Sequence, residues 1–480
     1  MLNSFFNRII SNLKNSNKIF FRHGDYVYLY KTVYLDLLKI NYFLNDFKKK
    51  KIILFSDKSI GYYTAVLGIF LSGNTWIQIS PNIPLYRIKK IIKFTNTKLG
   101  IYDKSFKNKK VLNIKAINIV ELDKILKSNK LKQFNKLKNI KNEDLSCIFF
   151  TSGSSSEPKG VKLSYENVIS AVLYQVNNLG YKKYQNFADC HDTSFVMSLN
   201  VIFPAIYLNC SISPLISFTD KISPIDFLND NKIDNLITVP SFILFNKNNI
   251  SKLKLKNLIL CGESFTSKIM MMLIKNNKIK YIFNCYGATE LSTWAFFYKL
   301  KSSDISIIKK NGRVPIGKPF NNLSYKFNDL KELIINGAVV SNGYLKNRKE
   351  TINKFKNTKG INSYNTGDVG FREKNLIFIK GRNDTQIKIR GYRVDLAEIE
   401  NISRSFKDIL FTFCFLNKDK LILAYNSEKE EHTRNLYIFL KKKLSPYMIP
   451  SKIIFIKKIP FNKNGKVDRI KIKKLDNVKF

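Results

Sequence analysis

Short apolar runs that end in turn-forming residues alternate with longer, helix-like stretches between residues 51 and 290, and this alternation most constrains the fold. The runs are KIILFSD, LGIYD, LSCIFFTSG, NLITVPS and NLILCGE. Such runs, bounded by Gly, Pro, Ser or Asp, are typical of buried strands. Strands that alternate with helices form parallel sheets, so the sequence predicts an α/β fold.

The polar ends of these runs indicate where a ligand binds. FFTSG, ITVPS, LILCGE and IFNCYGATE each place hydroxyl, thiol or carboxyl side chains directly after an apolar run. In open parallel sheets, ligands bind beyond the carboxyl ends of the strands. We therefore expect these four segments to line one site.

The texture of the sequence changes at about residue 312. GRVPIGKP, KELIINGAVVSNGY, SYNTGDVGF and NLIFIKGR are short strand-like segments with Gly turns, which predict a small β unit over 312–383. After GRNDTQIKIRGYRVDLAEIE a basic α/β segment runs to residue 480. A chain of this length forms more than one domain, so we predict a large domain over 1–383 and a small one over 384–480.

The formal net charge of +46 would suit a protein that binds nucleic acid. Lysine is accompanied by asparagine and isoleucine along the whole chain, which indicates a global compositional bias. The densest basic stretch, 104–141, lacks the regular aromatic residues of a stacking platform. We predict that the charge forms solvated faces and that nucleic acid is not a partner.

Cysteine usage and hydropathy constrain the compartment. The six cysteines form no CxxC pair and have no histidine at ligand spacing, which predicts a reducing, cytoplasmic setting. The opening 15 residues have a helical apolar stripe and no signal-peptide core. Residues 193–219 carry no charge, but Pro204 and Pro214 interrupt them, so we expect a buried helix and a buried strand without membrane insertion.

The loop FTSGSSSEPKGVKLS, residues 150–164, is rich in hydroxyl groups and glycine. Such a loop can offer O–H and backbone N–H donors to phosphate oxygens. The glycine that a P-loop needs before its lysine is absent, because Pro158 precedes Lys159. Taken alone, the composition of the segment favours a solvated, Ser-rich turn.

Nine segments in this order resemble the adenylate-forming (AMP-binding, ANL) superfamily, which comprises acyl-CoA synthetases, luciferases and the adenylation domains of peptide synthetases. They are LSGNTWIQISPNIPLYRI, FTSGSSSEPKGV, CHDTS, LCGE, NCYGATE, ELIINGAVVSNGY, YNTGDVG, GRNDTQIKIRGYRVDLAEIE and IPFNKNGKVDR. NGKVDR, QIKIRGYRV and the acid of CHDTS look most like amino-acid adenylation enzymes. Because the chain stops eleven residues after Arg469, we expect a stand-alone enzyme similar to D-alanine carrier-protein ligases.

The resemblance implies a fold and a reaction. The large domain would contain two parallel-rich α/β subdomains and a small β-barrel, and a small, mobile α+β domain would follow. A carboxylate would attack the α-phosphate of ATP with release of pyrophosphate. The phosphopantetheine thiol of a separate carrier protein would then attack the acyl adenylate. ATP and Mg²⁺ are the implied cofactors.

Residues that match the family's motifs inherit expected roles at the nucleotide. The resemblance implies that Tyr286 stacks on adenine, Thr289 contacts phosphate, Glu290 holds Mg²⁺, and Asp368 and Arg382 reach the ribose. The phosphate loop would consist of Thr151, Ser152, Gly153, Ser154, Ser155 and Lys159. Taken alone, Thr289 and Glu290 would mark a helix start after a strand, and Asp368 would be a turn residue. Among the nucleotide motifs, three positions depart from the family: Ser156, Ala288 and Asn365.

The C-terminal segment holds three further expected functions. Lys466 would donate to the substrate carboxylate and the α-phosphate, and it is the expected catalytic lysine. Asp384 matches the family's hinge, and Lys388 and Gly391 would line the thiol tunnel. Without the resemblance, Lys466 reads as a surface turn residue and IKIRG as a β-hairpin.

The substrate pocket is expected around Asp192 and Cys261. Asp192 aligns with the acid that pairs with the α-amino group in amino-acid-activating members, although it would also suit a helix N-cap. Cys261 would line the side-chain pocket, and His191 stands where relatives have phenylalanine. Two alternatives stay open: an acyl-CoA synthetase or aryl acid ligase, and a non-catalytic interaction protein that retains the fold.

Overall fold

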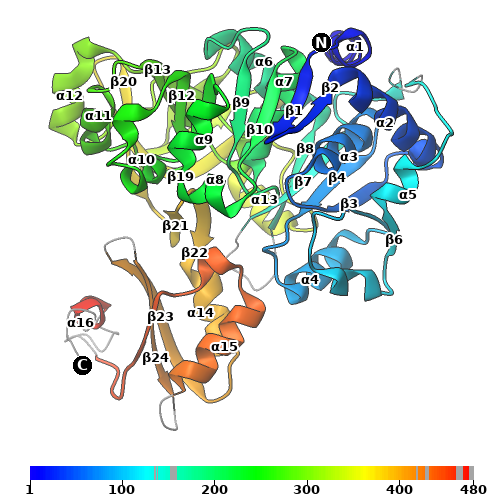
Figure 1. Ribbon diagram of the computed structural model, residues 1–480. Coiled ribbons are helices and arrows are strands. Elements are labelled where there is room, and N and C mark those ends of the chain that lie inside the picture. The colour runs from blue at the N-terminus through cyan, green and yellow to red at the C-terminus, as the bar shows by residue number, and fades with distance from the viewer. Residues whose placement is uncertain are drawn as a thin grey trace. The chain divides into compact units, whose positions relative to one another are not determined.

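The computed structural model describes residues 1–134, 137, 139–151, 159–417, 420–427, 432–460 and 469–474. The chain divides into two compact units (Figure 1). The first comprises residues 1–81, 95–150 and 160–383, and the second comprises 82–94, 151–159 and 384–480. The division along the main part of the chain thus falls between Asn383 and Asp384.

The larger sheet of the first unit has nine strands in the order β15-β14-β13-β12-β11-β9-β10-β1-β2. The strands from β1 through β10, β9, β11 and β12 to β13 are all parallel neighbours, which confirms the predicted α/β architecture. Their bounds are β1 (Ile19–His23), β2 (Tyr26–Leu29), β9 (Asn186–Asp189), β10 (Ser211–Pro214), β11 (Asn235–Thr238), β12 (Leu255–Cys261), β13 (Ile279–Tyr286), β14 (Phe296–Lys299) and β15 (Lys318–Pro319).

A second sheet has six strands in the order β6-β5-β3-β4-β7-β8. The pairs β6·β5, β5·β3, β3·β4 and β4·β7 are parallel. Their bounds are β3 (Lys51–Phe55), β4 (Thr75–Ile79), β5 (Leu99–Tyr102), β6 (Asn118–Glu121), β7 (Leu145–Thr151) and β8 (Lys159–Ser164). Near-continuous Ile, Leu and Phe in β3 agree with burial on both faces of a parallel sheet.

Helices cover these sheets and fill the core. The N-terminal stripe forms α1, with Phe5, Phe6, Ile9 and Leu13 buried, as the spacing predicted. Figure 1 shows α1, α2 and α3 packed beside one another. The helices from the first part of the chain are α1 (Leu2–Asn15), α2 (Tyr30–Phe43), α3 (Ile60–Leu71), α5 (Leu122–Leu126), α6 (Tyr165–Asn178), α7 (Leu199–Tyr207), α8 (Phe218–Ile222), α9 (Pro224–Asp230), α10 (Pro240–Phe245), α11 (Ser267–Leu273), α12 (Ile305–Asn311) and α13 (Arg348–Lys354).

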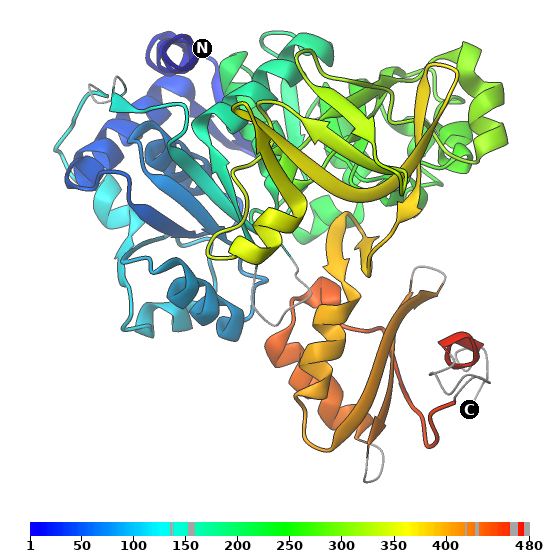
Figure 2. The ribbon, with the colours of Figure 1, turned by 180° about the vertical axis from the view of Figure 1, so that it is seen from behind.

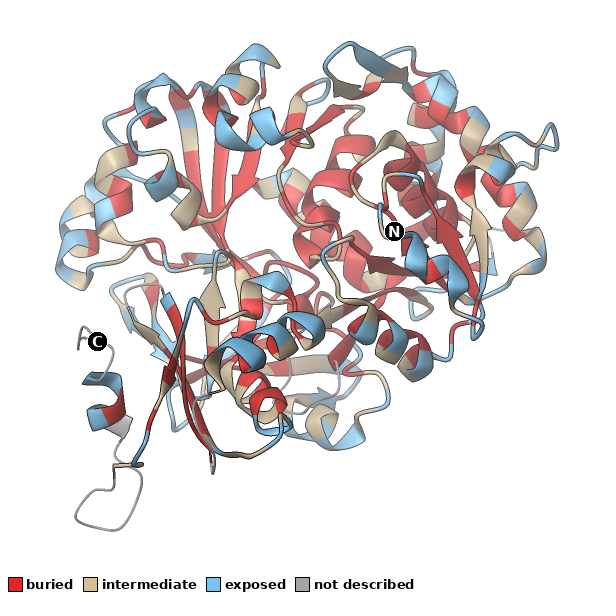
Figure 3. Ribbon diagram, turned by 60° about the horizontal axis from the view of Figure 1, so that its bottom comes forward, coloured by how far each residue is buried: buried red, intermediate tan, exposed pale blue. Residues whose placement is uncertain are grey.

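The uncharged stretch 193–219 is confirmed as a buried helix and a buried strand. It folds into a 3₁₀ turn (Val196–Ser198), α7 and β10, and most of these residues are buried. Within the described part of the chain, every helix is too short or too polar to cross a bilayer. Figure 3 shows that the strands of the first unit are largely buried and that the outer faces of its helices are exposed.

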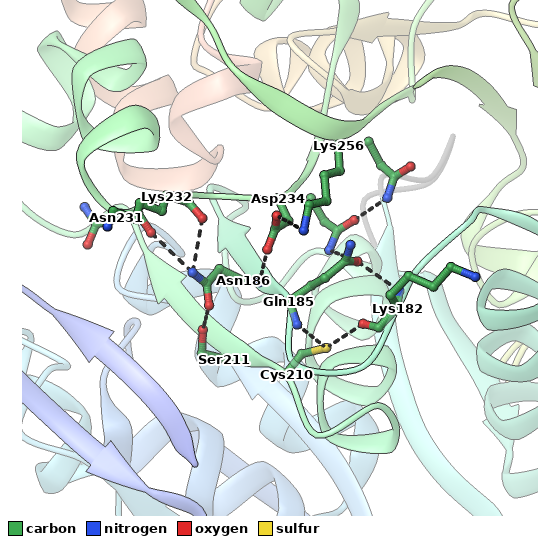
Figure 4. Close-up of polar contacts among 11 residues, drawn as sticks. Lys182, Gln185, Asn186, Cys210, Ser211, Asn231, Lys232, Asp234 and Lys256 are labelled. Carbon is green, nitrogen blue, oxygen red and sulfur yellow. Dashed lines mark hydrogen bonds and ion pairs between the residues drawn. The ribbon is translucent and has the colours of Figure 1, made fainter. Parts of the chain in front are cut away.

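A polar network holds the amino ends of the central strands together (Figure 4). The Asp234 carboxylate accepts a hydrogen bond from the Asn186 N–H at 2.9 Å and pairs with the Lys256 ammonium at 3.0 Å. The Cys210 thiol faces the Lys182 carbonyl oxygen at 3.2 Å. These contacts fix the strand register at one edge of the sheet and leave the opposite, carboxyl edge for the candidate site.

The small β unit predicted for 312–383 is a five-stranded antiparallel sheet. Its long strand β19 pairs with β17, β18 and β20, so the sheet branches there (Figure 2, yellow). The strand bounds are β16 (Ser324–Phe327), β17 (Glu332–Asn336), β18 (Phe355–Thr358), β19 (Ile361–Glu373) and β20 (Leu376–Arg382).

The second unit is a small α+β body with its own core, formed by residues that include Val394, Ile399, Leu423, Leu436 and Leu440. Helix α4 (Leu85–Thr95) contributes Arg87, whose guanidinium donates to the buried Glu398 carboxylate at 2.7 Å. The other elements are β21 (Gln386–Ile389), β22 (Tyr392–Asp395), α14 (Leu396–Arg404), β23 (Ile409–Asn417), β24 (Lys420–Ser427), α15 (Thr433–Lys443), β25 (Lys452–Phe455) and α16 (Arg469–Lys474).

Candidate active site

Four parallel strands end at the edge where the site was expected. β9 leads to His191 and Asp192, β12 ends at Cys261, and β13 ends at Tyr286. β11 lies between β9 and β12 and ends at Thr238. Because neighbouring parallel strands have their carboxyl ends at one edge, the structure gathers these predicted residues there.

Tyr286, Asp368 and Arg382, all predicted at the nucleotide, come together in the structure. The Tyr286 hydroxyl donates to Asp368 Oδ2 at 2.5 Å, and Arg382 Nη1 donates to Asp368 Oδ1 at 2.7 Å. Arg382 Nη2 also donates to the Thr366 carbonyl at 2.9 Å. Burial, with the Asp368 carboxylate next, raises the pKa of Tyr286 well above its usual value, so this hydroxyl stays a donor.

Register explains why two of these residues meet. Asp368 on β19 and Arg382 on β20 are direct cross-strand partners. Opposite charges at such a pair of positions attract, and a mostly buried guanidinium can bind a carboxylate strongly. A role of the three residues at a nucleotide stays a prediction.

The segment after β13 folds back tightly on itself. A Cβ atom at Gly287 would lie 2.0 Å from the Thr293 carbonyl oxygen, so a side chain at 287 cannot be accommodated. Thr289, Glu290 and Leu291 form a single 3₁₀ turn rather than the start of an α-helix. Thr293 has φ of 122°, a strained conformation for a β-branched residue.

Glu290 is buried in this turn, with 1% of its surface exposed. Its Oε1 accepts a hydrogen bond from the Tyr344 hydroxyl at 2.8 Å, and its carbonyl oxygen accepts one from the Ser341 N–H at 2.9 Å. Our sequence reasoning missed Tyr344, although it ends the quoted segment ELIINGAVVSNGY. Carboxylates that bind metal ions are commonly held in place by such hydrogen bonds, and a metal role of Glu290 stays a prediction.

The Asp192 carboxylate is held at both oxygens. Oδ1 accepts hydrogen bonds from the Ser194 N–H at 2.9 Å and the Ser194 hydroxyl at 2.6 Å. Oδ2 accepts one from the Ser80 hydroxyl at 3.2 Å. The helix N-cap alternative is wrong, because Asp192 closes a turn and Phe195 precedes the 3₁₀ helix that begins at Val196.

Cys261 is fully buried at the end of β12. Its thiol lies 3.7 Å from the Met197 sulfur and 3.6 Å from the Thr238 carbonyl oxygen. Both contacts are with other parts of the same sheet edge, so the thiol is packed against protein in this structure. A contact of Cys261 with substrate stays a prediction.

His191 is buried beside charged neighbours that sequence reasoning did not anticipate. The Asp189 carboxylate accepts hydrogen bonds from the backbone N–H of His191 and from the Tyr63 hydroxyl. Lys58 Nζ donates to the Asp189 carbonyl oxygen at 3.1 Å. Burial is the largest cause that lowers the pKa of His191, and with the smaller effect of the Lys58 charge it outweighs the opposing effect of the Asp189 carboxylate, so that the pKa is about 4. Lys58 follows β3 in FSDKS, a position that could have signalled it.

This burial predicts a stability that depends on pH. The folded state keeps His191 neutral, whereas the unfolded chain takes up a proton below pH 6.5, so stability falls as the pH drops from about 6.5 toward 4. Between pH 7 and pH 5 this one group should cost about 2 kcal/mol. Between pH 7 and pH 5, we expect the free energy of unfolding of the His191→Phe protein to fall by about 2 kcal/mol less than that of the unmodified protein, as measured by urea unfolding at both pH values. Equal losses in both proteins would contradict the burial argument.

Several predicted residues lie outside the described part of the chain. These are Lys466 and the loop residues Ser152, Gly153, Ser154, Ser155 and Ser156, whose roles stay predictions. Thr151 ends β7, and the buried Lys159 begins β8.

In the second unit, IKIRG forms the expected hairpin. β21 and β22 pair around Arg390 and Gly391, which have φ of 49° and 81°. Lys388 lies on β21, and Asp384 accepts a hydrogen bond from the Gln386 N–H at 3.2 Å. The hinge and thiol-tunnel roles stay predictions.

Comparison with known proteins extends over nearly the whole chain. A D-alanine–D-alanyl carrier protein ligase of Staphylococcus haemolyticus is 27% identical over 481 residues, which cover 95% of each protein. The protein of the same name from Staphylococcus aureus strain JH9 is 29% identical over 455 residues, 89% of this chain and 90% of that protein.

Solved structures agree in fold. The Vibrio cholerae adenylation domain AlmE, solved with glycyl-adenosine-5'-phosphate, has a TM-score of 0.84 at 16% identity and covers 99% of this chain and 98% of that one. A peptide-synthetase protein with adenylation and PCP domains has a TM-score of 0.86 at 17% identity over 99% of this chain and 84% of that one. Residues 14–345 match the model of the protein family described as "AMP-binding enzyme". This chain therefore belongs to the AMP-binding enzymes, the adenylate-forming superfamily that its nine motifs resemble.

Proposed function

We propose that this protein is an ATP-dependent, AMP-forming ligase that adenylates D-alanine and transfers it to the phosphopantetheine thiol of a separate carrier protein. The observation that most favours an amino acid is the Asp192 carboxylate, held by Ser80 and Ser194 at the carboxyl edge of the sheet. The near full-length relatives named D-alanine–D-alanyl carrier protein ligase support D-alanine in particular.

Asp192 would select the substrate by charge. A partly buried carboxylate attracts an ammonium group. It offers no such attraction to a substrate that lacks one, so the two kinds of substrate are bound with different affinity. Cys261 would line the side-chain pocket, and its contact with the buried Met197 would favour a methyl side chain over a larger one. A fatty or aryl acid would offer the Asp192 carboxylate no ammonium group to bind.

In the first step the substrate carboxylate oxygen forms a bond to the α-phosphorus, and the bond from that phosphorus to the bridging oxygen breaks. Pyrophosphate leaves with the electron pair. The protein's part is to position the reactants and to neutralise their charge. Asp368 and Arg382 would orient the ribose, Tyr286 would face the adenine, and Lys466 would neutralise charge on the α-phosphate.

Glu290 fits a Mg²⁺ ligand. Mg²⁺ is usually held by one or two carboxylates together with substrate phosphates, and it offsets the phosphate charge when bound. The residues that the structure describes contain no group of three or more His, Cys, Asp or Glu side chains able to hold a metal. A single carboxylate oriented by Tyr344 therefore suits an ion that arrives with ATP better than a permanently bound one.

In the second step the thiol sulfur bonds to the acyl carbon, the bond from that carbon to the AMP oxygen breaks, and the thiol proton is lost to solvent. AMP leaves with the electron pair. We assign Asp384 as the hinge and Lys388 and Gly391 to the thiol path, from their positions in the hairpin segment. The free thiols of all six cysteines suit a cytoplasmic location, where ATP and the carrier meet.

Loading of a carrier protein tests this proposal. The protein, ATP, Mg²⁺ and D-alanine are incubated with a D-alanyl carrier protein bearing phosphopantetheine, and the carrier is weighed intact. We expect a mass increase of one alanyl group on the carrier with phosphopantetheine and none on the carrier without it. Coenzyme A as the preferred acceptor, with an acid that lacks an amino group, would establish the acyl-CoA synthetase alternative instead.

A further inference from the structure

Glu332, the first residue of β17, is a buried carboxylate surrounded by three asparagine amides. Oε2 accepts hydrogen bonds from Asn328 Nδ2 at 2.9 Å and Asn365 Nδ2 at 2.8 Å. Oε1 accepts one from Asn383 Nδ2 at 3.2 Å. Glu332 retains 9% of its exposure. Asn328 lies in the turn between β16 and β17, Asn365 lies on β19 with Asp368, and Asn383 directly follows Arg382, the last residue of β20.

The two distant amides flank Asp368 and Arg382. Asn365 lies three residues before Asp368, and its Oδ1 accepts a hydrogen bond from the Gly367 N–H at 3.2 Å. Asn383 directly follows Arg382, and its N–H donates to the Gly367 carbonyl oxygen at 3.1 Å. Glu332 therefore ties together the two strand segments on which the cross-strand pair sits.

The strand pairing near Glu332 is irregular. The β17–β19 ladder shifts register between Glu332 and Ile334, and the β19–β20 ladder shifts between Val369 and Gly370. A bulge interrupts the regular hydrogen bonds and lets a strand bend. A side chain that binds both strands restores the order that the irregular ladders lose.

The chemistry of the cluster requires an ionised acceptor. A carboxylate only accepts hydrogen bonds, and all three neighbours present N–H donors. The hydrogen bond from Asn365 is the largest cause that lowers the pKa of Glu332, and the other two amides and the Lys354 charge also lower it.

We propose that Glu332 is a positioning residue that sets the geometry of the Asp368–Arg382 pair through Asn365 and Asn383, and thereby the affinity for ATP. The inference rests on the proposed function, because that function makes Asp368 and Arg382 ribose ligands. Glu332 acts on the pair through the strands that present it.

The Kd for ATP with Mg²⁺, measured by calorimetry without amino acid, tests this inference. In Glu332→Gln one acceptor becomes a donor that faces an asparagine donor, so we expect binding to weaken about tenfold. The double variant Glu332→Gln, Asn365→Asp places a carboxylate at 365, which can accept a hydrogen bond from the new amide at 332. We expect it to recover most of the lost affinity for ATP. Asn383→Ala, at an exposed position, should weaken binding several-fold and keeps the test available if Glu332→Gln does not fold.

Asn328→Ala is the matched control, because it removes a hydrogen bond to Glu332 that does not lead to the Asp368 pair. It should leave the Kd for ATP within about twofold. Unchanged binding in Glu332→Gln or Asn383→Ala, or an equal loss in Asn328→Ala, would overturn the inference. If the unmodified protein does not bind ATP, the proposed function fails instead, and the two failures are thereby distinguished.

Discussion

Glu290→Gln should lower kcat/KM for adenylation by about 10²–10³-fold while the protein stays folded. Glutamine has the same shape and can still accept the Tyr344 hydrogen bond, so the substitution removes charge and little else. The loss should appear in the rate of pyrophosphate exchange at saturating ATP. It should also appear as a higher Mg²⁺ concentration needed for half-maximal rate, because the lost carboxylate is the proposed ligand.

Tyr344→Phe provides the control for this prediction. It removes the hydroxyl that orients Glu290 but keeps the carboxylate, so we expect a loss of about tenfold, the usual size of an effect on a ligand's partner. A Glu290→Gln protein with unaltered melting temperature and a rate within threefold of the unmodified protein would show that Glu290 is not the metal ligand.

Asp192→Asn should lower kcat/KM for D-alanine by about 10²–10³-fold and leave the Kd for ATP unchanged. The amide can keep the hydrogen bond from one serine but has no charge to offer the α-ammonium group. The same change should narrow the preference for D-alanine over propionate, which differs from it by the missing amino group. Steady-state pyrophosphate exchange with both acids measures the two ratios.

Ser80→Ala is the matched variant for Asp192. It removes one 3.2 Å hydrogen bond to the carboxylate and keeps the charge, so a loss of only a few-fold is expected. If Asp192→Asn and Ser80→Ala lose the same amount, or if Asp192→Asn weakens ATP binding as strongly as D-alanine use, Asp192 has a structural role and the second, acyl acid reading gains weight.

Local patterns predicted the parts of the fold that local physics decides. The apolar runs became parallel strands, the N-terminal stripe became α1, and 193–219 became a buried helix and strand. The edge of the site followed from the same reasoning, because parallel strands share their carboxyl ends. Tyr286, Asp368 and Arg382 were named from motifs, and their meeting follows from strand pairing.

Contacts between distant segments could not be predicted in this way. Tyr344 is 54 residues from Glu290, and Asn383 is 51 residues from Glu332, so no periodicity links the partners. The N-cap reading of Asp192 failed for a related reason: the turn at Ser194 comes before the helix instead of starting it. The burial of His191 beside Lys58 and Asp189 also depends on which strands become neighbours.

The central claim is that the protein activates an amino acid, and pyrophosphate exchange into ATP across a panel of acids tests it most directly. The panel contains D-alanine, L-alanine, glycine, larger L- and D-amino acids, propionate, a medium-chain fatty acid and benzoate. The Lys466→Ala protein serves as the inactive control. We predict exchange that is strongest with D-alanine, weak with propionate and lost in the Lys466→Ala protein. Exchange supported by the fatty or aryl acids and not by any amino acid would contradict the claim.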